Sequence, residues 1–502
     1  MQMLLRTSLT TLALLGGVWV AGPVHAQVVD IGVLPGGASC EATGINSAHT
    51  LIGQCLSSRT SQSRTTAVFQ NSGDAAPTRL PVLVSGKPCI VAAIGDDGSI
   101  SGQCEDANGT RQPVRWSLDA SGGYTTAPTT LLPFQRGLQN QLATELGWGV
   151  DVNAIAGPVN SLGAIIGVSE SRHGSRTAVL WNPGATAPVR LHKPNLRAEQ
   201  GFVQGCEPLA INDAASLTIV GHCKISVAGT TTDVAVSWTS QNGDYRATVL
   251  NDLRAGHCVA RDVNNAGDVV GACENISGNS TAVLWAANGV LATEVIRANQ
   301  SIAVKINNAG VITGSYLTPD NYAHAYVGDP RVAAVSDIGT LAGGHNCVAQ
   351  GLDDAGDVVA DCDNATSSRL AGYRAASATS VVAIPLSTIA SSVRGISHNG
   401  AVAGVYTSAD GHARGFRDEA PSTSASAQPV TAVSASSTGA SMANMAMAGF
   451  AAGVAEGSGL LYADPYASVT QAYKQNPNGL AFFGTAYTSG NPSPVANEVY
   501  AF

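Results

Sequence analysis

Short apolar stretches alternate with turns rich in Gly, Asn and Asp along most of this 502-residue chain. A phrase close to A-x-x-I-N-x-x-G-x-V-x-G recurs eight times; two clear copies are ARDVNNAGDVVG (Ala260–Gly271) and AVKINNAGVITG (Ala303–Gly314). The positions equivalent to its Asn are Asn46, Gly95, Asn160, Asn212, Asn264, Asn307, Asp353 and Ser397. They follow one another at steps of 49, 65, 52, 52, 43, 46 and 44 residues. Periods near 50 residues are typical of β-propeller blades.

Each copy of the phrase predicts a β-hairpin. An Asn or Asp favours a tight turn because its side chain bonds the backbone two residues on, and a Gly three positions later allows the left-handed conformation. Six copies have that Gly; His49 and the longer turn at Ala214–Ser216 are the exceptions. The predicted hairpins lie near residues 40–55, 89–104, 152–168, 206–223, 258–273, 302–315, 347–362 and 392–406.

Further short strands follow each hairpin, for example TAVLW at 177 and again at 281, and a fourth strand follows in several units, as in PVRL at 188. Four antiparallel strands make one propeller blade. The sequence therefore predicts an all-β fold over residues 27–418, an eight-bladed β-propeller of four-stranded antiparallel blades.

The N-terminal strand is predicted to close the ring. The pattern of Asp30-Ile31-Gly32 and the residues after it recurs 307 positions later as Asp337-Ile338-Gly339. The second copy is expected to be the fourth strand of a blade, whereas no blade precedes the first copy. The last unit supplies only three strands, so residues 28–34 are expected to complete it and leave no free sheet edge.

The ten cysteines support this register. The two cysteines of each successive pair lie equally far from the centre of their predicted turn, which places them face to face across one hairpin and within disulfide range. The expected disulfides are Cys40–Cys55, Cys89–Cys104, Cys206–Cys223, Cys258–Cys273 and Cys347–Cys362. Histidines beside some of them (His222, His257 and His345) suggest a metal site as an alternative, but the C-x-x-C spacing of zinc sites is absent.

Export is predicted by residues 1–26, which carry one positive charge at Arg6, a short apolar run and small residues before Ala26. Paired cysteines agree with an oxidising compartment. We expect a secreted or extracellular protein, with the periplasm or cell surface as alternatives, and no transmembrane helix. The net charge of −9 becomes −10 without Arg6, which excludes a general nucleic-acid binder.

Two stretches fall outside the repeat. Gln135–Gly149 has the Leu138, Leu142 and Leu146 spacing of a short amphipathic helix. Residues 419–440 form a Ser/Ala-rich linker by composition, and residues 441–502 form a small-residue-rich C-terminal region that we expect to be mostly irregular.

These residues together resemble a family of bacterial extracellular repeat proteins named for a His-Ala-Phe (HAF) tripeptide in the strand after the hairpin. The tripeptide stands here as His324-Ala325-Tyr326 and, more loosely, as His412-Ala413 before Phe416. The D-I-G-x-L-x-G-G phrase of that family appears at Asp30–Gly37 and Asp337–Gly344. The resemblance covers about residues 28–417 and implies a repeat architecture but no known reaction.

The sequence contains no G-x-S-x-G, H-E-x-x-H or P-loop motif. Ser397-His398 and the turn aspartates Asp96, Asp97, Asp353, Asp354 and Asp357 are explained by turn geometry, although calcium binding or acid–base chemistry is the alternative for the aspartates. We expect no catalytic residues, cofactor or metal.

Two functions stay open. The favoured one is a monomeric binding or scaffold module whose ligand is a glycan, peptide or host surface. The alternative is a propeller-type polysaccharide hydrolase or lyase, which needs carboxylates from different blades converging on the axis. The glutamates available for it are Glu41, Glu105, Glu170, Glu199, Glu207, Glu274 and Glu294.

Overall fold

A computed structural model describes most of the chain up to residue 419. The described ranges are residues 28–37, 39–56, 65–135, 151–171, 175–196, 201–227, 229–252, 257–287, 289–298, 300–386, 388 and 390–419. The predicted signal segment, nearly all of the predicted helix at Gln135–Gly149, and the linker and C-terminal region beyond Glu419 lie outside these residues. The described part consists of strands and turns, and no helix in it is long and apolar enough to cross a membrane.

The strands form eight units of four, in which each unit's strands follow one another in the sheet. Blades 1 to 4 contain, in order, β2 (Ser39–Ile45), β3 (Leu51–Leu56), β4 (Thr65–Gln70) and β5 (Thr78–Arg79); β6 (Cys89–Ile94), β7 (Ile100–Glu105), β8 (Arg111–Trp116) and β9 (Thr129–Thr130); β10 (Asp151–Val159), β11 (Ile165–Ser171), β12 (Arg176–Trp181) and β13 (Val189–His192); and β14 (Phe202–Ile211), β15 (Thr218–Val227), β16 (Thr230–Gln241) and β17 (Asp244–Val249).

Blades 5 to 8 contain β18 (Cys258–Val263), β19 (Val269–Glu274), β20 (Ser280–Trp285) and β21 (Ala292–Glu294); β22 (Ser301–Ile306), β23 (Ile312–Leu317), β24 (Ala323–Gly328) and β25 (Ser336–Asp337); β26 (Cys347–Leu352), β27 (Val358–Asp363), β28 (Arg369–Arg374) and β29 (Val382–Ala383); and β30 (Ser391–Ile396), β31 (Val402–Thr407), β32 (Ala413–Asp418) and β1 (Val28–Asp30).

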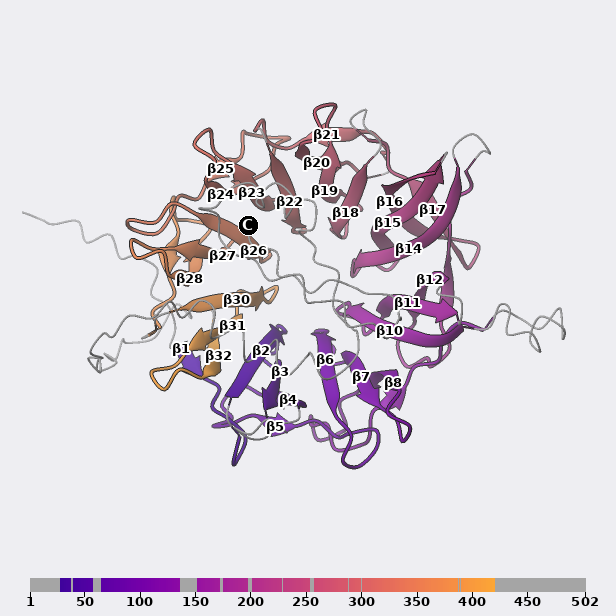
Figure 1. The fold of residues 1–502 in the computed structure, drawn as a ribbon, viewed down its shortest axis with the longest axis vertical. Coiled ribbons are helices and arrows are strands. Elements are labelled where there is room, and N and C mark those ends of the chain that lie inside the picture. Colours follow the sequence, from indigo (N-terminus) through magenta and orange to yellow (C-terminus); the bar gives the residue numbers. More distant parts are fainter. Residues whose placement is uncertain are drawn as a thin grey trace, which may run out of the picture.

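The blades are arranged in a ring with the first strand of each blade on the inside (Figure 1). Each of these inner strands (β2, β6, β10, β14, β18, β22, β26 and β30) contacts the inner strands of both neighbouring blades. The predicted all-β propeller with eight blades is confirmed. Blades 3 and 4 are additionally joined at their outer edge, where β13 pairs in parallel with β17.

The N-terminal strand closes the ring as predicted. β1 pairs antiparallel with β32, so that Val28 lies opposite Asp418 and Asp30 opposite Phe416. The Ile31 N–H also donates to the Gly415 carbonyl at 3.1 Å. The paired segment is shorter than expected, since it spans residues 28–30 of the predicted 28–34.

The hairpins differ from the predicted register by two deviations that offset each other. Every inner strand contains a β-bulge near its end, for example between Ala42 and Gly44. The loop of the hairpin is also one residue longer than expected, because the Asn46 N–H donates to the Thr50 carbonyl at 3.1 Å, outside the bond from the His49 N–H to the Asn46 carbonyl at 2.9 Å. The two deviations cancel, so Cys40 still lies opposite Cys55. His49, which stands where other turns have Gly, takes the same left-handed conformation, with φ 59°.

Small residues on the third strands bring neighbouring blades close together. One position per blade lies opposite the residue that follows Gly53 or its equivalent on the second strand, which is Ala360 in blade 7. This position holds Ala67, Pro113, Ala178, Ala235, Ala282, Ala325, Ala371 or Gly415. A Cβ on Gly415 would lie 2.4 Å from the Ile31 side chain and 2.9 Å from the Ala42 nitrogen. The Ala of the His-Ala-Tyr tripeptide is therefore a packing requirement.

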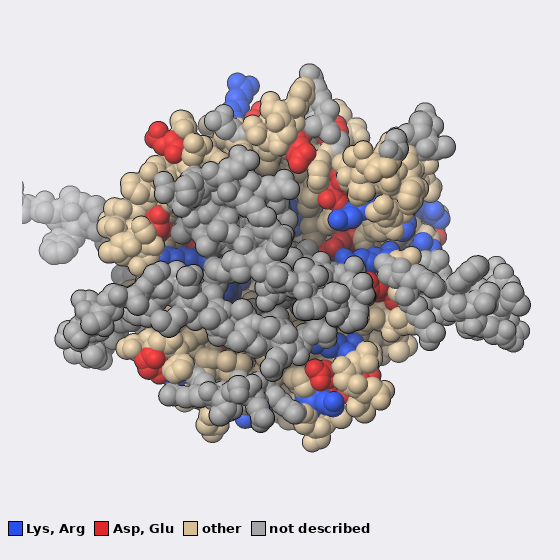
Figure 2. Space-filling model, viewed as in Figure 1, with Lys and Arg blue, Asp and Glu red and all other residues tan. Residues whose placement is uncertain are grey.

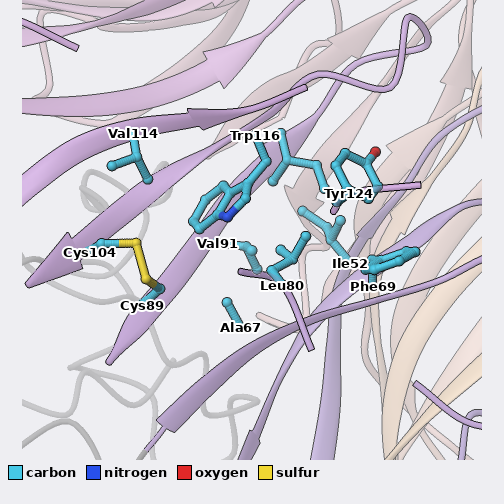
Figure 3. Packing of buried hydrophobic residues seen from close by; sticks show 11 residues of the cluster. Ile52, Ala67, Phe69, Leu80, Cys89, Val91, Cys104, Val114, Trp116 and Tyr124 are labelled. Atoms are coloured by element: carbon cyan, nitrogen blue, oxygen red, sulfur yellow. A yellow bond between two sulfur atoms is a disulfide. The ribbon is translucent and has the colours of Figure 1, made fainter. Parts of the chain in front are cut away.

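Large aromatic residues fill the seams between blades. At the seam of blades 1 and 2, Ala67 and Phe69 belong to one buried cluster with Trp116 and the Cys89–Cys104 disulfide (Figure 3), in which the Phe69 ring meets Tyr124 edge-on with centroids 4.8 Å apart. The four buried tryptophans also donate hydrogen bonds from Nε1 to carbonyls in the preceding blade: Trp116 to Pro81 at 2.8 Å, Trp181 to Leu132 at 3.0 Å, Trp238 to His192 at 2.8 Å and Trp285 to Asn251 at 2.8 Å. The seams are thus sealed by packing and fixed in register by hydrogen bonds.

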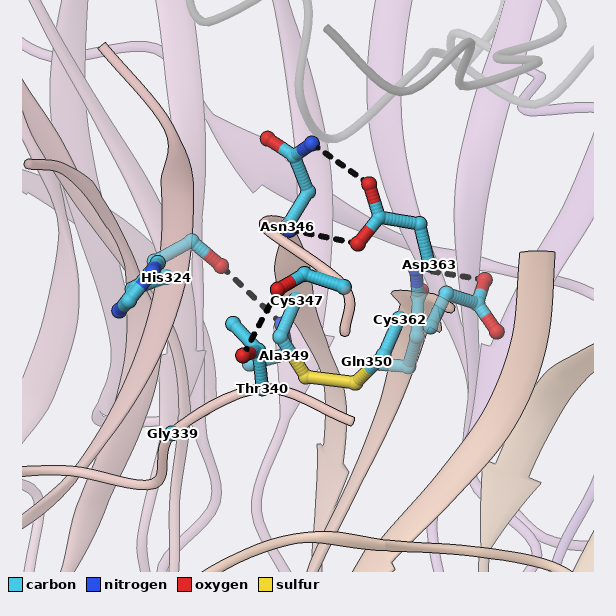
Figure 4. The surroundings of a disulfide bond; sticks show 12 residues. His324, Gly339, Thr340, Asn346, Cys347, Ala349, Gln350, Cys362 and Asp363 are labelled. Carbon is cyan, nitrogen blue, oxygen red and sulfur yellow. Dashed lines mark hydrogen bonds between the residues drawn. A yellow bond between two sulfur atoms is a disulfide. The ribbon is translucent and has the colours of Figure 1, made fainter. Parts of the chain in front are cut away.

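Five disulfides join the cysteine pairs named above, each within one hairpin, with Cα atoms 3.9–4.1 Å apart. The described residues contain no free cysteine. Figure 4 shows the Cys347–Cys362 disulfide of blade 7. Beside it, Asp363 accepts hydrogen bonds from the Asn346 backbone N–H and side-chain Nδ2, at 2.7 and 2.8 Å, which fixes the entry into β26.

Two of the three blades without a disulfide have a Ser and a Tyr at the positions that cysteines occupy elsewhere. In blade 6, Ser301 lies opposite Tyr316, whose hydroxyl donates to Asp337 at 2.7 Å. In blade 8, Ser391 lies opposite Tyr406, whose hydroxyl donates to Asp30 at 2.8 Å. Both aspartates begin a D-I-G phrase and also accept the N–H of its glycine, Gly339 or Gly32, at 2.6 and 2.8 Å. The phrase appears twice because these two blades use it to hold their outer strand.

Loss of a single disulfide is expected to loosen one blade and leave the ring intact. In a Cys89→Ala/Cys104→Ala variant, we expect the unfolding free energy to fall by about 3 kcal/mol, the chain-entropy value for a loop of this size. Amide hydrogen exchange should rise in residues 89–116 and remain unchanged in the blades opposite. Non-reducing peptide mapping of the native protein checks the pairing, and a linkage between blades would contradict it.

Candidate binding surface at the turn end of the ring

The eight turns that join first and second strands meet around the axis, because they end the inner strands. The residue after each Asn-equivalent position forms a set that we call the mouth residues: Ser47, Asp96, Ser161, Asp213, Asn265, Asn308, Asp354 and His398. All are polar, and none is Lys or Arg. Asn265, Asn308, Asp354 and His398 are exposed, and the other four are partly buried.

A belt of asparagine side chains lies directly beneath the mouth residues. In five blades the Nδ2 group donates to a turn carbonyl of the next blade: Asn46 to Gly95 at 3.0 Å, Asn160 to Asn212 at 2.9 Å, Asn212 to Asn264 at 3.0 Å, Asn264 to Asn307 at 3.2 Å and Asn307 to Asp353 at 3.0 Å. These side chains are buried. Each Oδ1 caps its own turn, as where Asn46 accepts the Thr50 N–H at 2.9 Å. The turn asparagines therefore link blades as well as bending the chain.

The mouth residues are linked in the same direction. A backbone N–H in one blade donates to the mouth side chain of the next: Ser47 to Asp96 at 2.7 Å, Ser161 to Asp213 at 2.6 Å, Asp213 to Asn265 at 2.8 Å and Asn265 to Asn308 at 2.9 Å. Asn399 closes the circle by donating from Nδ2 to the Ser47 carbonyl at 2.9 Å. This hydrogen bonding fixes the positions of the mouth side chains relative to one another.

Asp96 contacts mouth residues of three other blades. Its carboxylate accepts the Ser47 hydroxyl at 3.0 Å and the Ser161 hydroxyl at 3.2 Å, and it lies 3.5 Å from His398 Nδ1. These partners belong to blades 1, 3 and 8, whereas Asp96 belongs to blade 2. The turn end of the axis is therefore narrow on this side, and its polar groups converge on one carboxylate.

Three blades lack the belt asparagine, having Gly95, Asp353 or Ser397 instead. The same three blades carry a long polar residue at one equivalent position of the third strand, which is Arg115, Tyr373 or Arg417. The other blades have Phe69, Leu180, Ser237, Leu284 or Val327 there.

The two arginines reach into the next blade. Arg115 donates to carbonyls of Asn182 and Ala185 in blade 3, both at 3.0 Å. Arg417 donates to carbonyls of His49 and Asn71 in blade 1, at 3.4 and 3.1 Å. A guanidinium on the third strand thus replaces the belt contact that Gly95 and Ser397 cannot make.

Replacing Asp353 with Asn should stabilise the protein. Burial raises the pKa of the Asp353 carboxyl to about 6, so the folded state binds an extra proton between about pH 4 and pH 6, and stability falls as pH rises through that window. Asp353→Asn removes this penalty and supplies a belt donor. We expect about 1–3 kcal/mol of added stability above pH 6 and a smaller gain below pH 4. Urea unfolding of both proteins across that pH range tests this, and an unchanged or lower midpoint above pH 6 would contradict it.

The aspartates considered for calcium binding or acid–base chemistry have structural partners. Asp97 accepts the Ser99 N–H and hydroxyl at 2.9 and 2.7 Å, and Asp353 accepts the Asp357 N–H at 2.7 Å. Asp357 accepts the Tyr373 hydroxyl and the Ala376 N–H. Asp96 and Asp354 are mouth residues. No group of three or more His, Cys, Asp or Glu side chains in the described part of the chain is placed to hold a metal ion.

The candidate glutamates are distributed over the propeller. Glu199 lies outside the described residues, and the other six lie in five different blades. No hydrogen bond or ion pair joins any two of those six. Burial raises the pKa of Glu41, against the opposing effect of Arg394, and Glu207 lies 3.6 Å from Arg176.

The candidate histidines have different partners and do not form one cluster. His222 and His257 approach Asp233, but at different carboxylate oxygens, each 3.8 Å from a ring nitrogen. His345 stacks on Tyr322 with ring centroids 4.8 Å apart. Ser397 donates its hydroxyl to Asn399 at 2.7 Å, while the neighbouring His398 faces Asp96, so these two do not form a nucleophile–base pair.

The sequence predicts the turns themselves, but it does not predict the hydrogen bonds that join the turns of neighbouring blades. The Asn belt could have been inferred from Asn at five equivalent positions, because turn formation alone accepts Asp equally well. The replacement of the belt by Arg115 and Arg417 left no signal in one sequence, since it depends on third-strand register. On the face seen in Figure 2, the visible Lys and Arg side chains are interspersed with Asp and Glu around the perimeter.

No family model and no curated protein matches this chain. Among solved structures, it is similar to a puromycin hydrolase (TM-score 0.45, 12% identity, 74% of this chain and 59% of that one). It is also similar to the β-propeller domain of the Trilobed protease from Pyrococcus furiosus (TM-score 0.42, 10% identity, 67% and 95%). The chain spans less than two thirds of the length of the puromycin hydrolases it matches. The propeller assignment rests on the strand pairing described above.

Proposed function

We propose that this protein is an exported binding module of the HAF repeat type, and that the mouth residues form its ligand-contacting surface. Export is supported by the predicted signal segment at residues 1–26 and by five disulfides with no free cysteine among the described residues. The family is supported by the D-I-G phrases and the His-Ala-Tyr tripeptide.

The observation that carries the proposal is the ring of pre-positioned polar side chains at the turn end. Their backbone partners hold them in place before any ligand arrives, which lowers the ordering cost of binding. Exposed polar atoms remain at Asn265, Asn308 and Asp354. Groups of this kind suit a ligand rich in hydroxyl or amide groups, such as a glycan or a peptide backbone.

Binding is favoured over the alternative of a polysaccharide hydrolase or lyase. A glycosidase needs two carboxylates about 5–9.5 Å apart on opposite sides of a sugar. At the turn end, the Asp96 carboxylate is already engaged with two hydroxyls and His398.

The test is a glycan and peptide array probed with the purified mature chain and with an Asn308→Ala/Asp354→Ala variant. We expect binding by the native protein that the variant loses. The matched control is Asp320→Ala, an exposed residue of a loop at the opposite end of blade 6, which should bind normally. Equal loss in the control, or binding that the mouth variant retains, would refute the mouth as the site. Hydrolysis of an array glycan would favour the enzyme instead.

A further inference from the structure

One carboxylate at the seam of blades 4 and 5 is shared by two imidazoles. Asp233 on β16 lies 3.8 Å from Nε2 of His222 on β15 through one oxygen, and 3.8 Å from Nε2 of His257 through the other. His257 directly precedes β18 of blade 5. The group lies toward the disulfide end of the ring, next to Cys223 and Cys258, and far along the strands from the mouth residues.

His222 occupies a tightly packed position of the seam. It lies opposite Ala235, which packs with Val220 against Cys258 and Ala260 of blade 5. Equivalent positions in the other blades hold Gln54, Gln103, Val168, Ala272, Ser315, Asp361 and Val405. None of these is a histidine, so the imidazole beside this packed cluster is particular to blade 4.

The acidic groups around His222 do not outnumber the basic groups while the imidazole is neutral. Glu207 on β14 and Asp233 are acidic, and Lys224 on β15 and Arg261 on β18 are basic. Glu207 is also 3.6 Å from Arg176 of blade 3. A proton on His222 would therefore add an uncompensated positive charge to the seam.

Only one of the two nitrogens of the His222 imidazole faces a group that could accept a hydrogen bond. Nε2 faces Asp233, whereas Nδ1 is buried and has no hydrogen-bond partner among the described residues. A neutral imidazole tolerates this, because the second nitrogen then carries no hydrogen. Protonation would place a buried N–H there without an acceptor, which is costly. Burial accordingly lowers the pKa of His222.

We propose that His222 makes the seam between blades 4 and 5 acid-sensitive, so that its protonation opens this seam at the disulfide end while the other seams stay closed. Because the folded state disfavours the protonated ring, the stabilising effect is present at neutral pH and is lost as pH falls below about 6.5, the ordinary value for histidine. In an exported protein, this would couple the shape of one blade pair to the acidity of its surroundings.

Amide hydrogen exchange at about pH 7.5 and about pH 5 tests the proposal, after correction for the intrinsic pH dependence of exchange. In the native protein we expect at least about a tenfold rise in exchange at acid pH in residues 218–227 and 258–263, and little change in blades 1 and 8. His222→Gln should remove that rise while retaining the neutral-pH pattern.

His257→Gln is the matched control, because it alters the other imidazole on the same carboxylate. It should keep the acid response of residues 218–227. The proposal is overturned if His222→Gln still opens at acid pH, if only His257→Gln abolishes the opening, or if acid raises exchange equally in all eight blades. Should His222→Gln fold poorly, His222→Asn provides a second neutral variant for the same comparison.

Discussion

Deleting residues 28–36 should cause the largest loss of stability among the changes considered for this ring. The deletion removes β1 and with it the fourth strand of blade 8. It also removes Ile31 and Leu34, which are buried among Cys40, Ala42 and Ala403 at the junction of blades 8 and 1. Losing one large buried side chain typically costs 2–5 kcal/mol, so we expect a decrease of at least about 5 kcal/mol in the unfolding free energy.

Thermal and urea unfolding of the oxidised protein measure this effect. Truncation after Glu419 is the control, because it keeps the hydrogen bond from the Ser72 hydroxyl to Glu419 and every paired strand. We expect that truncated chain to unfold at the native midpoint. A deletion variant as stable as the native protein would mean that the ring does not depend on its N-terminal strand.

Asp361→Ala should have the second-largest effect. Asp361 on β27 is almost fully buried and accepts hydrogen bonds from Gln350 and Arg369 of its own blade. It also accepts the Ser392 hydroxyl at 2.9 Å and the Val393 N–H at 2.8 Å from blade 8. Alanine removes the carboxylate that accepts these four hydrogen bonds and that faces the Arg369 guanidinium. Removing one partner of a buried ion pair costs about 3–5 kcal/mol, and we expect a loss in that range.

The measurement is again equilibrium unfolding, together with hydrogen exchange in β27 and β30. Asp354→Ala serves as the control, since Asp354 is an exposed aspartate of the same blade whose removal should change stability by less than about 0.5 kcal/mol. If the two variants proved equally stable, the contacts of Asp361 across the seam of blades 7 and 8 would contribute little.

The periodic part of the fold was readable from the sequence, because it depends on short-range turn chemistry. Asn264 and Gly267 each specify a local backbone conformation, and eight copies of that pattern define the blades. The outer strands were less predictable. The run RLPVLV at 79 reads as a full strand, yet the strand there spans only Thr78 and Arg79, and one further backbone bond to β4 comes from the Leu80 N–H. Pairing there is limited by the twist and spacing of the blades, which a single segment does not encode.

The candidate site was predictable in position and not in detail. That the turns gather around the axis follows from the propeller itself. The hydrogen bond from Ser161 back to Asp96, and the exchange of an asparagine for Arg417, arise from contacts between segments far apart in the chain. Such contacts depend on the exact register of neighbouring blades, where a shift of one residue would turn each side chain to the opposite face.

The pairing of Val28 with Asp418 has a consequence for the order in which the chain assembles. Most contacts here form within a hairpin or between consecutive blades, so blades 1 to 7 are able to form progressively as the polypeptide emerges. The strand β1, however, is synthesised before all the blades and pairs only with β32 of the last blade. It therefore has no partner until nearly all of the propeller has been synthesised. Closing so long a loop carries an entropic cost that the local hairpins avoid. Maturation should therefore end with one slow joining step, during which both exposed strand edges are open to pairing with another molecule.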